Sequence, residues 1–284
     1  MAAQEHLRPF GARLREAMDG RGPLCAGIDP HPALLDAWGL TDSLPGLERF
    51  AMTAAEALAP RVAVVKPQSA FFERHGSKGI AVLEKVVETS RLAGALVLLD
   101  VKRGDIGSTS QAYADAYLDP RSPLFCDAVT ASPYLGFGSL DPLFASARAS
   151  GSGVFVLALT SNPEAGQVQH ALDADGRTVA GAVLRALAGA NAGERPMGSL
   201  GAVVGATIGE TTEDLDINGP LLVPGVGAQG GTAESVRRIF AGVLHRVLPA
   251  SSREILRAGP SAAALVAAAE ATVETFAALL EAPG

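Results

Sequence analysis

The chain has 284 residues, of which 48% are hydrophobic, and a formal net charge of −7 at pH 7. We expect a single domain over residues 1–284, because chains of this length commonly fold around one large core. The acidic balance argues against nucleic acid as a partner, since phosphate backbones require clustered Lys and Arg. No uncharged apolar run has the length of a membrane span, and the first residues lack a signal-peptide pattern. We therefore expect a cytoplasmic globular protein with no membrane partner.

The first half of the chain alternates short apolar runs with amphipathic segments. Apolar residues recur at helical spacing over residues 5–18, which predicts a lead-in helix that plugs one end of the fold. The apolar runs predict strands over residues 24–28, 62–66, 95–99 and 126–130. The segments that follow them predict helices over residues 45–59, 80–93, 109–118 and 138–149.

The second half continues the same alternation. Strands are predicted over residues 154–159, 201–205, 221–223 and 242–248. Helices are predicted over residues 179–190, 210–217, 232–240 and 260–280, with Thr232 as an N-cap. The polar stretch from Thr160 to about Thr178 is longer than most connections, which indicates a lid or binding loop; a plain surface insertion is the alternative.

Eight strand–helix units predict an α/β fold of the TIM (β/α)8 barrel type with an N-terminal lead-in helix. A doubly wound open sheet is the competing architecture. The barrel is favoured because charged or polar residues end most of the strands, at the end where barrel enzymes carry their active sites. These residues are Asp29, Lys66, Asp100, Thr130 and Ser161.

One stretch joins a buried strand to three charged residues: Leu-Val-Leu-Leu-Asp100-Val-Lys102-Arg-Gly-Asp105. Side chains two apart on a strand share a face, so Asp100 and Lys102 should be neighbours. The glycine lets the chain turn, which would bring Asp105 toward the same ammonium group. An ammonium between two carboxylates stays charged, so Lys102 suits proton donation better than attack on a carbonyl. A structural ion pair at a strand end is the alternative.

A glycine-rich stretch, Pro-Gly-Val-Gly-Ala-Gln229-Gly-Gly-Thr, follows the seventh predicted strand and opens a helix. Glycines allow close backbone approach, and a helix N-terminus offers unpaired N–H groups to an anion. Arg253, just past the eighth predicted strand, would add a guanidinium to the same anion. Barrels commonly bind phosphate after strands seven and eight, so we predict a phosphate site here; a tight turn without a ligand is the alternative.

A metal site is not indicated by the sequence. Cys25 and Cys126 lie far apart in predicted buried strands, and neither belongs to a pair with metal-ligand spacing. Both are therefore interpreted as small core residues. We expect that the site needs no metal.

Together these motifs resemble the orotidine 5′-phosphate decarboxylase family over most of the chain. The specific elements are Asp-x-Lys-x-x-Asp at residues 100–105, followed by Ile-Gly-Ser-Thr, and Pro-Gly-Val-Gly-Ala-Gln-Gly-Gly at residues 224–231. Asp29 after the first strand and Lys66 after the second also fit. The long loop after strand five, and Ser-Arg253-Glu-Ile-Leu where many relatives have Val-Gly-Arg, resemble the longer-chain, type 2 subgroup.

The resemblance implies conversion of orotidine 5′-monophosphate to uridine 5′-monophosphate (UMP) and CO2 in pyrimidine biosynthesis, with neither metal nor organic cofactor. It implies that Lys102 protonates C6 of the pyrimidine. The implied neighbours and substrate contacts are Asp100, Asp105 and Lys66 beside it, Asp29 and Thr109 on the ribose, Ser161 on the pyrimidine, and Gln229 and Arg253 on the phosphate. The resemblance also places Asp105 and Thr109 in the partner subunit's site, so a homodimer with shared active sites is expected.

Two other functions remain as alternatives at this point. Related barrels that act on sugar phosphates, such as 3-keto-gulonate 6-phosphate decarboxylase and hexulose phosphate synthase, share Asp-x-Lys-x-x-Asp and stabilise an enediolate with magnesium. The long loop after strand five and the Gly-Ala-Gln-Gly-Gly stretch favour the nucleotide enzyme. A catalytically silent nucleotide-binding module is disfavoured by the complete row of charged residues.

Overall fold

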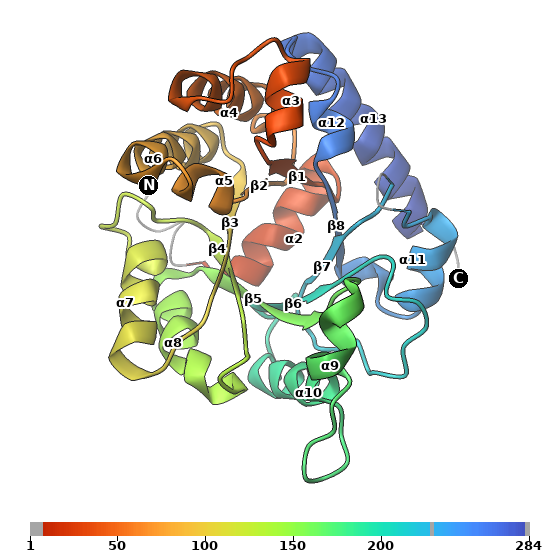
Figure 1. Cartoon of the computed structure of the whole chain (residues 1–284). Coiled ribbons are helices and arrows are strands. Elements are labelled where there is room, and N and C mark those ends of the chain that lie inside the picture. The colour runs from red at the N-terminus through yellow and green to blue at the C-terminus, as the bar shows by residue number, and fades with distance from the viewer. Residues whose placement is uncertain (1–7, 228–229, 282–284) are drawn as a thin grey trace.

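The computed structural model describes residues 8–227 and 230–281. Eight parallel strands form a closed barrel in chain order, and β8 pairs with β1 to complete it (Figure 1). The strands are β1 (Cys25–Ile28), β2 (Val64–Pro67), β3 (Leu96–Arg103), β4 (Ala128–Ala131), β5 (Gly153–Leu159), β6 (Leu200–Val204), β7 (Leu221–Pro224) and β8 (Val247–Ser251). The prediction of a TIM barrel is confirmed, and the open doubly wound sheet is excluded.

Helices surround the barrel, and one of them, α2, lies across its end (Figure 1). They are α2 (Phe10–Arg21), α3 (Pro32–Ala37), α4 (Leu44–Leu58), α5 (Ala70–Glu73), α6 (Gly76–Leu92), α7 (Gly107–Leu118), α8 (Asp141–Ser150), α9 (Gly166–Gln169), α10 (Val179–Ala190), α11 (Ala233–Ile239), α12 (Arg253–Leu256) and α13 (Ala262–Glu281). The strands are nearly continuous hydrophobic runs because both faces are buried, one inside the barrel and one against these helices.

The predicted lead-in helix is α2, and it closes the N-terminal end of the barrel. Phe10, Leu14 and Met18 are buried in the same cluster as the residues that fill the barrel interior. The Phe10 ring meets the Phe155 ring edge to face, with 5.9 Å between centroids. A Cβ at Gly153 would lie 2.4 Å from the Phe10 ring, so the start of β5 must be glycine for the plug to fit.

Two predicted elements are wrong. The segment over residues 210–217 is not a helix, because Thr211, Asp214 and Asp216 accept hydrogen bonds from backbone N–H groups two residues further on, and such local bonds compete with helix formation. The eighth strand begins at Val247 rather than at residue 242. It also continues past the predicted end at Leu248, through Pro249 to Ser251.

One helix of the described chain, α13, is long and apolar enough to cross a membrane by length and composition alone. Its buried residues belong to the core between barrel and helices: Leu265, Ala269, Phe276 and Leu279. The helix packs along α4 and β8 as the last outer helix of the barrel. This packing accounts for the apolar face.

Candidate active site

A row of three charged side chains lies at the carboxyl ends of β2 and β3. The Lys66 Nζ donates to Asp100 Oδ2 at 2.8 Å, and the Lys102 Nζ donates to Asp100 Oδ1 at 2.5 Å. The predicted pairing of Asp100 with Lys102 is confirmed. We expected the Lys102 ammonium between the Asp100 and Asp105 carboxylates. In the described chain the order is the reverse: the Asp100 carboxylate lies between the Lys66 and Lys102 ammonium groups.

Burial and charge act in opposite directions on this row. Burial alone would raise the pKa of Asp100, but the ammonium groups of Lys66 and Lys102 outweigh it and hold that pKa well below its usual range. Burial alone would lower the pKa of Lys66, and the Asp100 and Asp29 carboxylates hold it above its usual value. Both groups are therefore charged at neutral pH. The nearby Cys25 thiol is inert, since burial raises its pKa to about 12.

The strand that carries Asp100 and Lys102, β3, is longer than predicted. The sequence predicted it over residues 95–99, and β3 continues to Arg103 after a register shift against β4. Lys102 lies within this irregular part and has a positive φ of 45°. The N–H groups of Val101 and Lys102 both donate to the Thr130 hydroxyl, at 3.0 and 2.9 Å. That hydroxyl donates to Asp100 Oδ1 at 2.9 Å.

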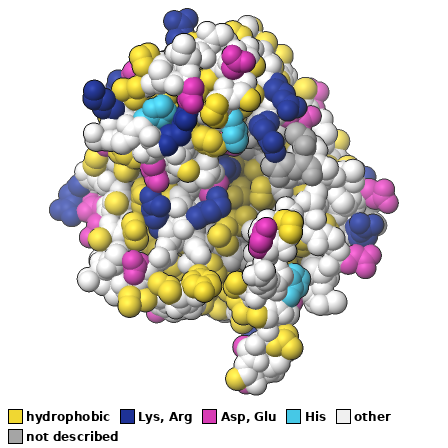
Figure 2. Space-filling model, in the orientation of Figure 1, with side chains coloured by type: hydrophobic (Ala, Val, Ile, Leu, Met, Phe, Trp, Pro, Cys, Tyr) yellow, Lys and Arg dark blue, Asp and Glu magenta, His cyan; other side chains and the backbone are white. Residues whose placement is uncertain are grey.

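A cavity of about 340 Å³ opens beside this row and joins it to the ends of β1, β7 and β8. Asp29, Lys66, Asp100 and Arg253 line it, so four of the predicted site residues share one cavity. Two of the six buried side-chain polar atoms without a hydrogen-bond partner in the described chain belong to this lining, Asp29 Oδ1 and Ser252 Oγ. Buried polar atoms are nearly always paired, so these two indicate where a ligand binds. Figure 2 shows Lys and Arg side chains gathered around the centre of this face.

The predicted phosphate loop forms the end of the cavity that lies beyond β7. Pro224, Gly225 and Val226 line the cavity, and the Gly231 N–H donates to the Gly225 carbonyl at 3.0 Å, which closes a tight loop. Thr232 caps α11 as predicted, through a reciprocal pair of bonds with Ser235. Arg253 is the exposed first residue of α12. The predicted Gln229 lies outside the described residues.

Four predicted residues of the described chain are not among those that line the cavity: Lys102, which borders it through its bond to Asp100, and Asp105, Thr109 and Ser161. Asp105 forms no ion pair with Lys102 within the described chain; its Oδ1 accepts from the Ile106 N–H at 2.8 Å. Thr109 is exposed in the first turn of α7. Ser161 is exposed just past β5, at the start of a segment that contains α9 and a hairpin projecting from the barrel (Figure 1).

Sequence reasoning missed several residues of the site. Thr130 was noted only as the polar end of a strand, and its hydrogen bond to Asp100 joins residues 30 positions apart in the sequence. Ser252, His31 and Gln68 also line the cavity. Their positions directly after strand ends were the available signal, since His31 follows Asp29 closely and Gln68 follows Lys66.

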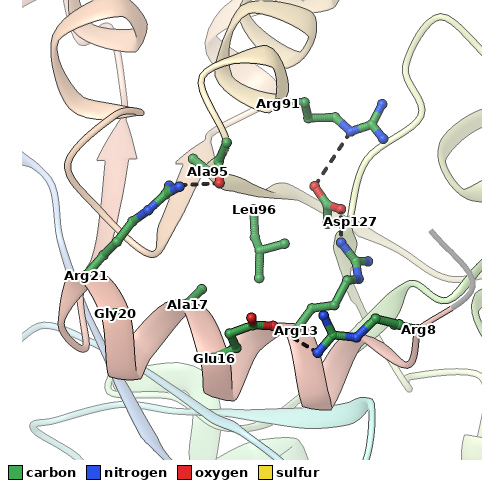
Figure 3. Close-up of a pocket in the computed structure, with 11 residues that line it drawn as sticks. Arg8, Arg13, Glu16, Ala17, Gly20, Arg21, Arg91, Ala95, Leu96 and Asp127 are labelled. Atoms are coloured by element: carbon green, nitrogen blue, oxygen red, sulfur yellow. Dashed lines mark hydrogen bonds and ion pairs between the residues drawn. The ribbon is translucent and has the colours of Figure 1, made fainter. Parts of the chain in front are cut away.

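A larger cavity, of about 500 Å³, lies at the opposite end of the barrel beside α2 (Figure 3). Its charged side chains are paired or bonded to backbone. Arg13 donates to Asp127 Oδ1 at 2.5 Å and Arg21 donates to the Gly94 carbonyl at 2.7 Å. These bonds attach α2 to the barrel, so this cavity has a structural explanation. Catalytic residues of barrel enzymes come from the other end.

The described residues contain no group of three or more His, Cys, Asp and Glu arranged to hold a metal ion. Asp100 is one of the carboxylates that line the cavity. Both of its oxygens already accept hydrogen bonds from ammonium groups.

Comparison with known proteins agrees with this geometry. Residues 22–268 match the model of the orotidine 5′-phosphate decarboxylase / HUMPS family. The orotidine 5′-phosphate decarboxylase of Streptomyces coelicolor is 61% identical over 93% of this chain and 95% of its own, and that of Nocardioides sp. is 66% identical over 88% and 92%.

Solved structures give the same result. A crystal structure from Streptomyces avermitilis has a TM-score of 0.95 at 60% identity and covers 97% of each chain. Leishmania donovani OMP decarboxylase has a TM-score of 0.74 at 30% identity, over 97% of this chain and 100% of its own. The chain therefore belongs to the orotidine 5′-phosphate decarboxylase / HUMPS family.

Proposed function

We propose that the chain is a carboxy-lyase that converts orotidine 5′-monophosphate to UMP and CO2 in pyrimidine biosynthesis, acting in the cytoplasm as one barrel domain. The observation that carries this function is the Lys66–Asp100–Lys102 row, in which Lys66 and Asp100 are buried, beside a cavity that Lys66, Asp100 and Arg253 line. The cavity volume is within the range of small-molecule sites. One nucleotide bound in this cavity would therefore reach both the charged row and the predicted phosphate loop.

The proposed chemistry centres on the Lys102 ammonium. When the bond between C6 and the carboxylate carbon breaks, CO2 leaves and the electron pair stays on C6, where the ring offers no conventional electron sink. A fixed ammonium stabilises this developing charge and then transfers its proton to C6. The Lys102 side chain is 47% exposed, so solvent can return the proton after product leaves.

Asp100 and Lys66 act by holding that ammonium. Asp100 accepts a hydrogen bond from each Lys on a different oxygen, which fixes its own orientation and that of Lys102. With two ammonium groups and one carboxylate, the row has a net charge of about +1. This excess suits a substrate that carries a carboxylate as well as a phosphate.

The remaining contacts are assigned along the cavity. Asp29, with its unpaired Oδ1, is proposed to accept hydrogen bonds from the ribose hydroxyls. Gln229 and Arg253 are proposed to bind the phosphate together with the backbone of the glycine-rich loop, and Ser161 to bind the pyrimidine. Binding of the distant phosphate can orient the ring over the charged row, and this raises the rate of the chemical step.

Asp105 and Thr109 are proposed to act in the site of a partner subunit in a homodimer. In the described chain Asp105 makes no ion pair with Lys102. Lys102 lies in the last part of β3, and Asp105 lies in the loop that follows β3, so both are at the same end of the barrel. Apolar side chains are exposed nearby: Ile106, Tyr134 and Leu135. These exposed apolar side chains lie beside a charged row that Asp105 of the same chain does not join. Both observations support a subunit interface at this end of the barrel.

The test is turnover of orotidine 5′-monophosphate by the purified chain, followed by the absorbance of the orotate ring in the presence of EDTA. We expect full activity with chelator, and loss of nearly all activity in Lys102→Ala with folding and UMP binding retained. Lys85→Ala, at an exposed Lys paired with Glu48, is the matched control and should retain full activity. Activity that chelation removes and magnesium restores would favour the sugar-phosphate enzymes instead. Substantial turnover by Lys102→Ala would exclude its role as proton donor.

A further inference from the structure

Thr130 occupies the point where the regular pairing of β3 with β4 breaks down. Leu99 pairs with Val129, and the next pair is Arg103 with Ala131. Three residues of β3, namely 100–102, therefore lie opposite Thr130 alone. Bulges of this kind re-aim side chains, and they are enriched next to active sites.

The Thr130 hydroxyl replaces the missing ladder partner of β3. Backbone N–H groups of β3 would bond to carbonyls of β4 in a regular parallel ladder. Here the N–H groups of Val101 and Lys102 both donate to Thr130 Oγ1, at 3.0 and 2.9 Å. Thr130 is 1% exposed, so water has no access to replace its oxygen. One side-chain atom thus holds the backbone of the bulge.

The same hydroxyl has a fixed direction as a donor. A hydroxyl carries one hydrogen and two lone pairs, and the two backbone N–H groups occupy both lone pairs of Thr130. Its single hydrogen is left for Asp100 Oδ1, at 2.9 Å. That oxygen is also the one that accepts from the Lys102 Nζ. Thr130 is therefore linked to both ends of Lys102. It bonds directly to the Lys102 backbone nitrogen, and it shares Asp100 Oδ1 with the Lys102 ammonium.

The backbone of Lys102 needs such support. Its φ of 45° lies in the left-handed region, which residues other than Gly, Asn and Asp seldom adopt unless their surroundings impose it. This conformation determines the direction in which the Lys102 side chain leaves the strand. Without the hydroxyl, the bulge can relax and carry the ammonium away from Asp100.

We infer that Thr130 is a positioning residue for the decarboxylation, acting through the bulge and Asp100 to place the Lys102 ammonium. This inference rests on the proposed role of Lys102 as proton donor. Thr130 does not line the cavity beside the row, so its loss should affect the chemical step rather than nucleotide binding.

The experiment compares two pairs of variants that differ by the hydroxyl alone. Wild type against Thr130→Val keeps the side-chain shape, and Thr130→Ser against Thr130→Ala repeats the comparison in a smaller side chain. We expect Thr130→Val to lower kcat about 100-fold, because misplacement of a catalytic group by about 1 Å costs that order. The KM for orotidine 5′-monophosphate should change less than about threefold. Thr130→Ser should retain kcat within about fivefold of wild type.

Two controls separate this role from a structural one and from the proposed function. Thr272→Val makes the same change on α13, where the hydroxyl donates to the Ala268 carbonyl, and should leave kcat unchanged. Lys102→Ala tests the donor itself. An active Lys102→Ala would overturn the proton-donor role and with it this inference. An inactive Lys102→Ala beside a Thr130→Val with kcat near wild type would overturn the inference alone. If Thr130→Val does not fold, equal kcat values for the Ser and Ala variants would overturn it.

Discussion

At the residue scale, the site depends on how completely Asp100 is bonded. Its two carboxylate oxygens accept from Lys66, Lys102 and Thr130, and its side chain is 9% exposed. A buried carboxylate in this state cannot rotate without breaking a charge-assisted bond. The two ammonium groups are thus held at fixed places before substrate binds. Preorganised charge of this kind costs no reorganisation during the reaction.

The substitution Lys66→Met tests the energetic side of this arrangement. The Lys66 and Asp100 side chains are 10% and 9% exposed, so the variant leaves a buried carboxylate with one ammonium in place of two. Breaking a buried pair costs about 3–5 kcal/mol, and we expect about 3 kcal/mol here because Lys102 remains. Urea unfolding at pH 7 measures the loss. Lys85→Met, at an exposed pair, should cost less than about 1 kcal/mol.

The loss of unfolding free energy in Lys66→Met should depend on pH. The pKa of Asp100 is lowered by folding, so its stabilisation is present above its unfolded pKa of about 3.9 and is lost as the pH falls through the lower folded value. The pKa of Lys66 is raised, so its stabilisation is full below about 10.4 and is lost as the pH rises through the folded value. The cost of Lys66→Met should be greatest between these limits and smaller at pH 3. An equal cost at pH 3 and pH 7 would contradict the assignment.

At the element scale, the carboxyl ends of the strands carry the site, and the sequence predicted that placement well. Apolar runs that stop at Asp29, Lys66 and Asp100 mark strand ends, because a charge is costly inside a barrel wall. What it could not predict depends on contacts across strands. The extension of β3 to Arg103 follows from the Thr130 bonds, and no local pattern around residue 102 encodes a partner on β4.

The eighth strand begins later in the chain than predicted. Residues 242–248 include apolar residues in a strand-like run, and the strand was predicted over that run. In the barrel this run begins with a turn at Gly242, whose φ is 83°, and Val243 is buried there outside any strand. The pairing of Pro249 with Val223 of β7 is a tertiary contact, which overrides the local pattern.

The junction of β8 and α12 should bind the phosphate through Arg253. In Arg253→Ala we expect KM to rise about 10- to 100-fold with a smaller loss of kcat, since a hydrogen bond to a charged group contributes about 1.5–3 kcal/mol. Steady-state kinetics with orotidine 5′-monophosphate measures both. The matched control is Arg257→Ala, an exposed arginine one turn further on, which should leave KM unchanged. Equal KM values for the two variants would remove Arg253 from the phosphate site.

At the scale of the whole molecule, the end of the barrel that carries the charged row also carries an apolar surface. Ile106, Tyr134 and Leu135 are 63%, 76% and 52% exposed. The two loops that bear them lie side by side, because the Ser132 N–H donates to the Arg103 carbonyl at 2.8 Å. Asp105 belongs to the same surface. A two-fold interface formed here would give each subunit's Asp105 to its partner.

Mixing two inactive variants tests whether the site is shared. Lys102→Ala and Asp105→Ala should each be inactive alone, since every site of the first variant lacks Lys102 and every site of the second lacks Asp105. If Asp105 acts in trans, a mixed dimer has one site with both lesions and one site with neither. Random subunit exchange at equal amounts makes half of the dimers mixed, so about a quarter of wild-type activity should return. Exchange is verified with differently tagged subunits. If Asp105 serves its own subunit, every site keeps a lesion, and activity that stays absent after verified exchange would exclude the shared site.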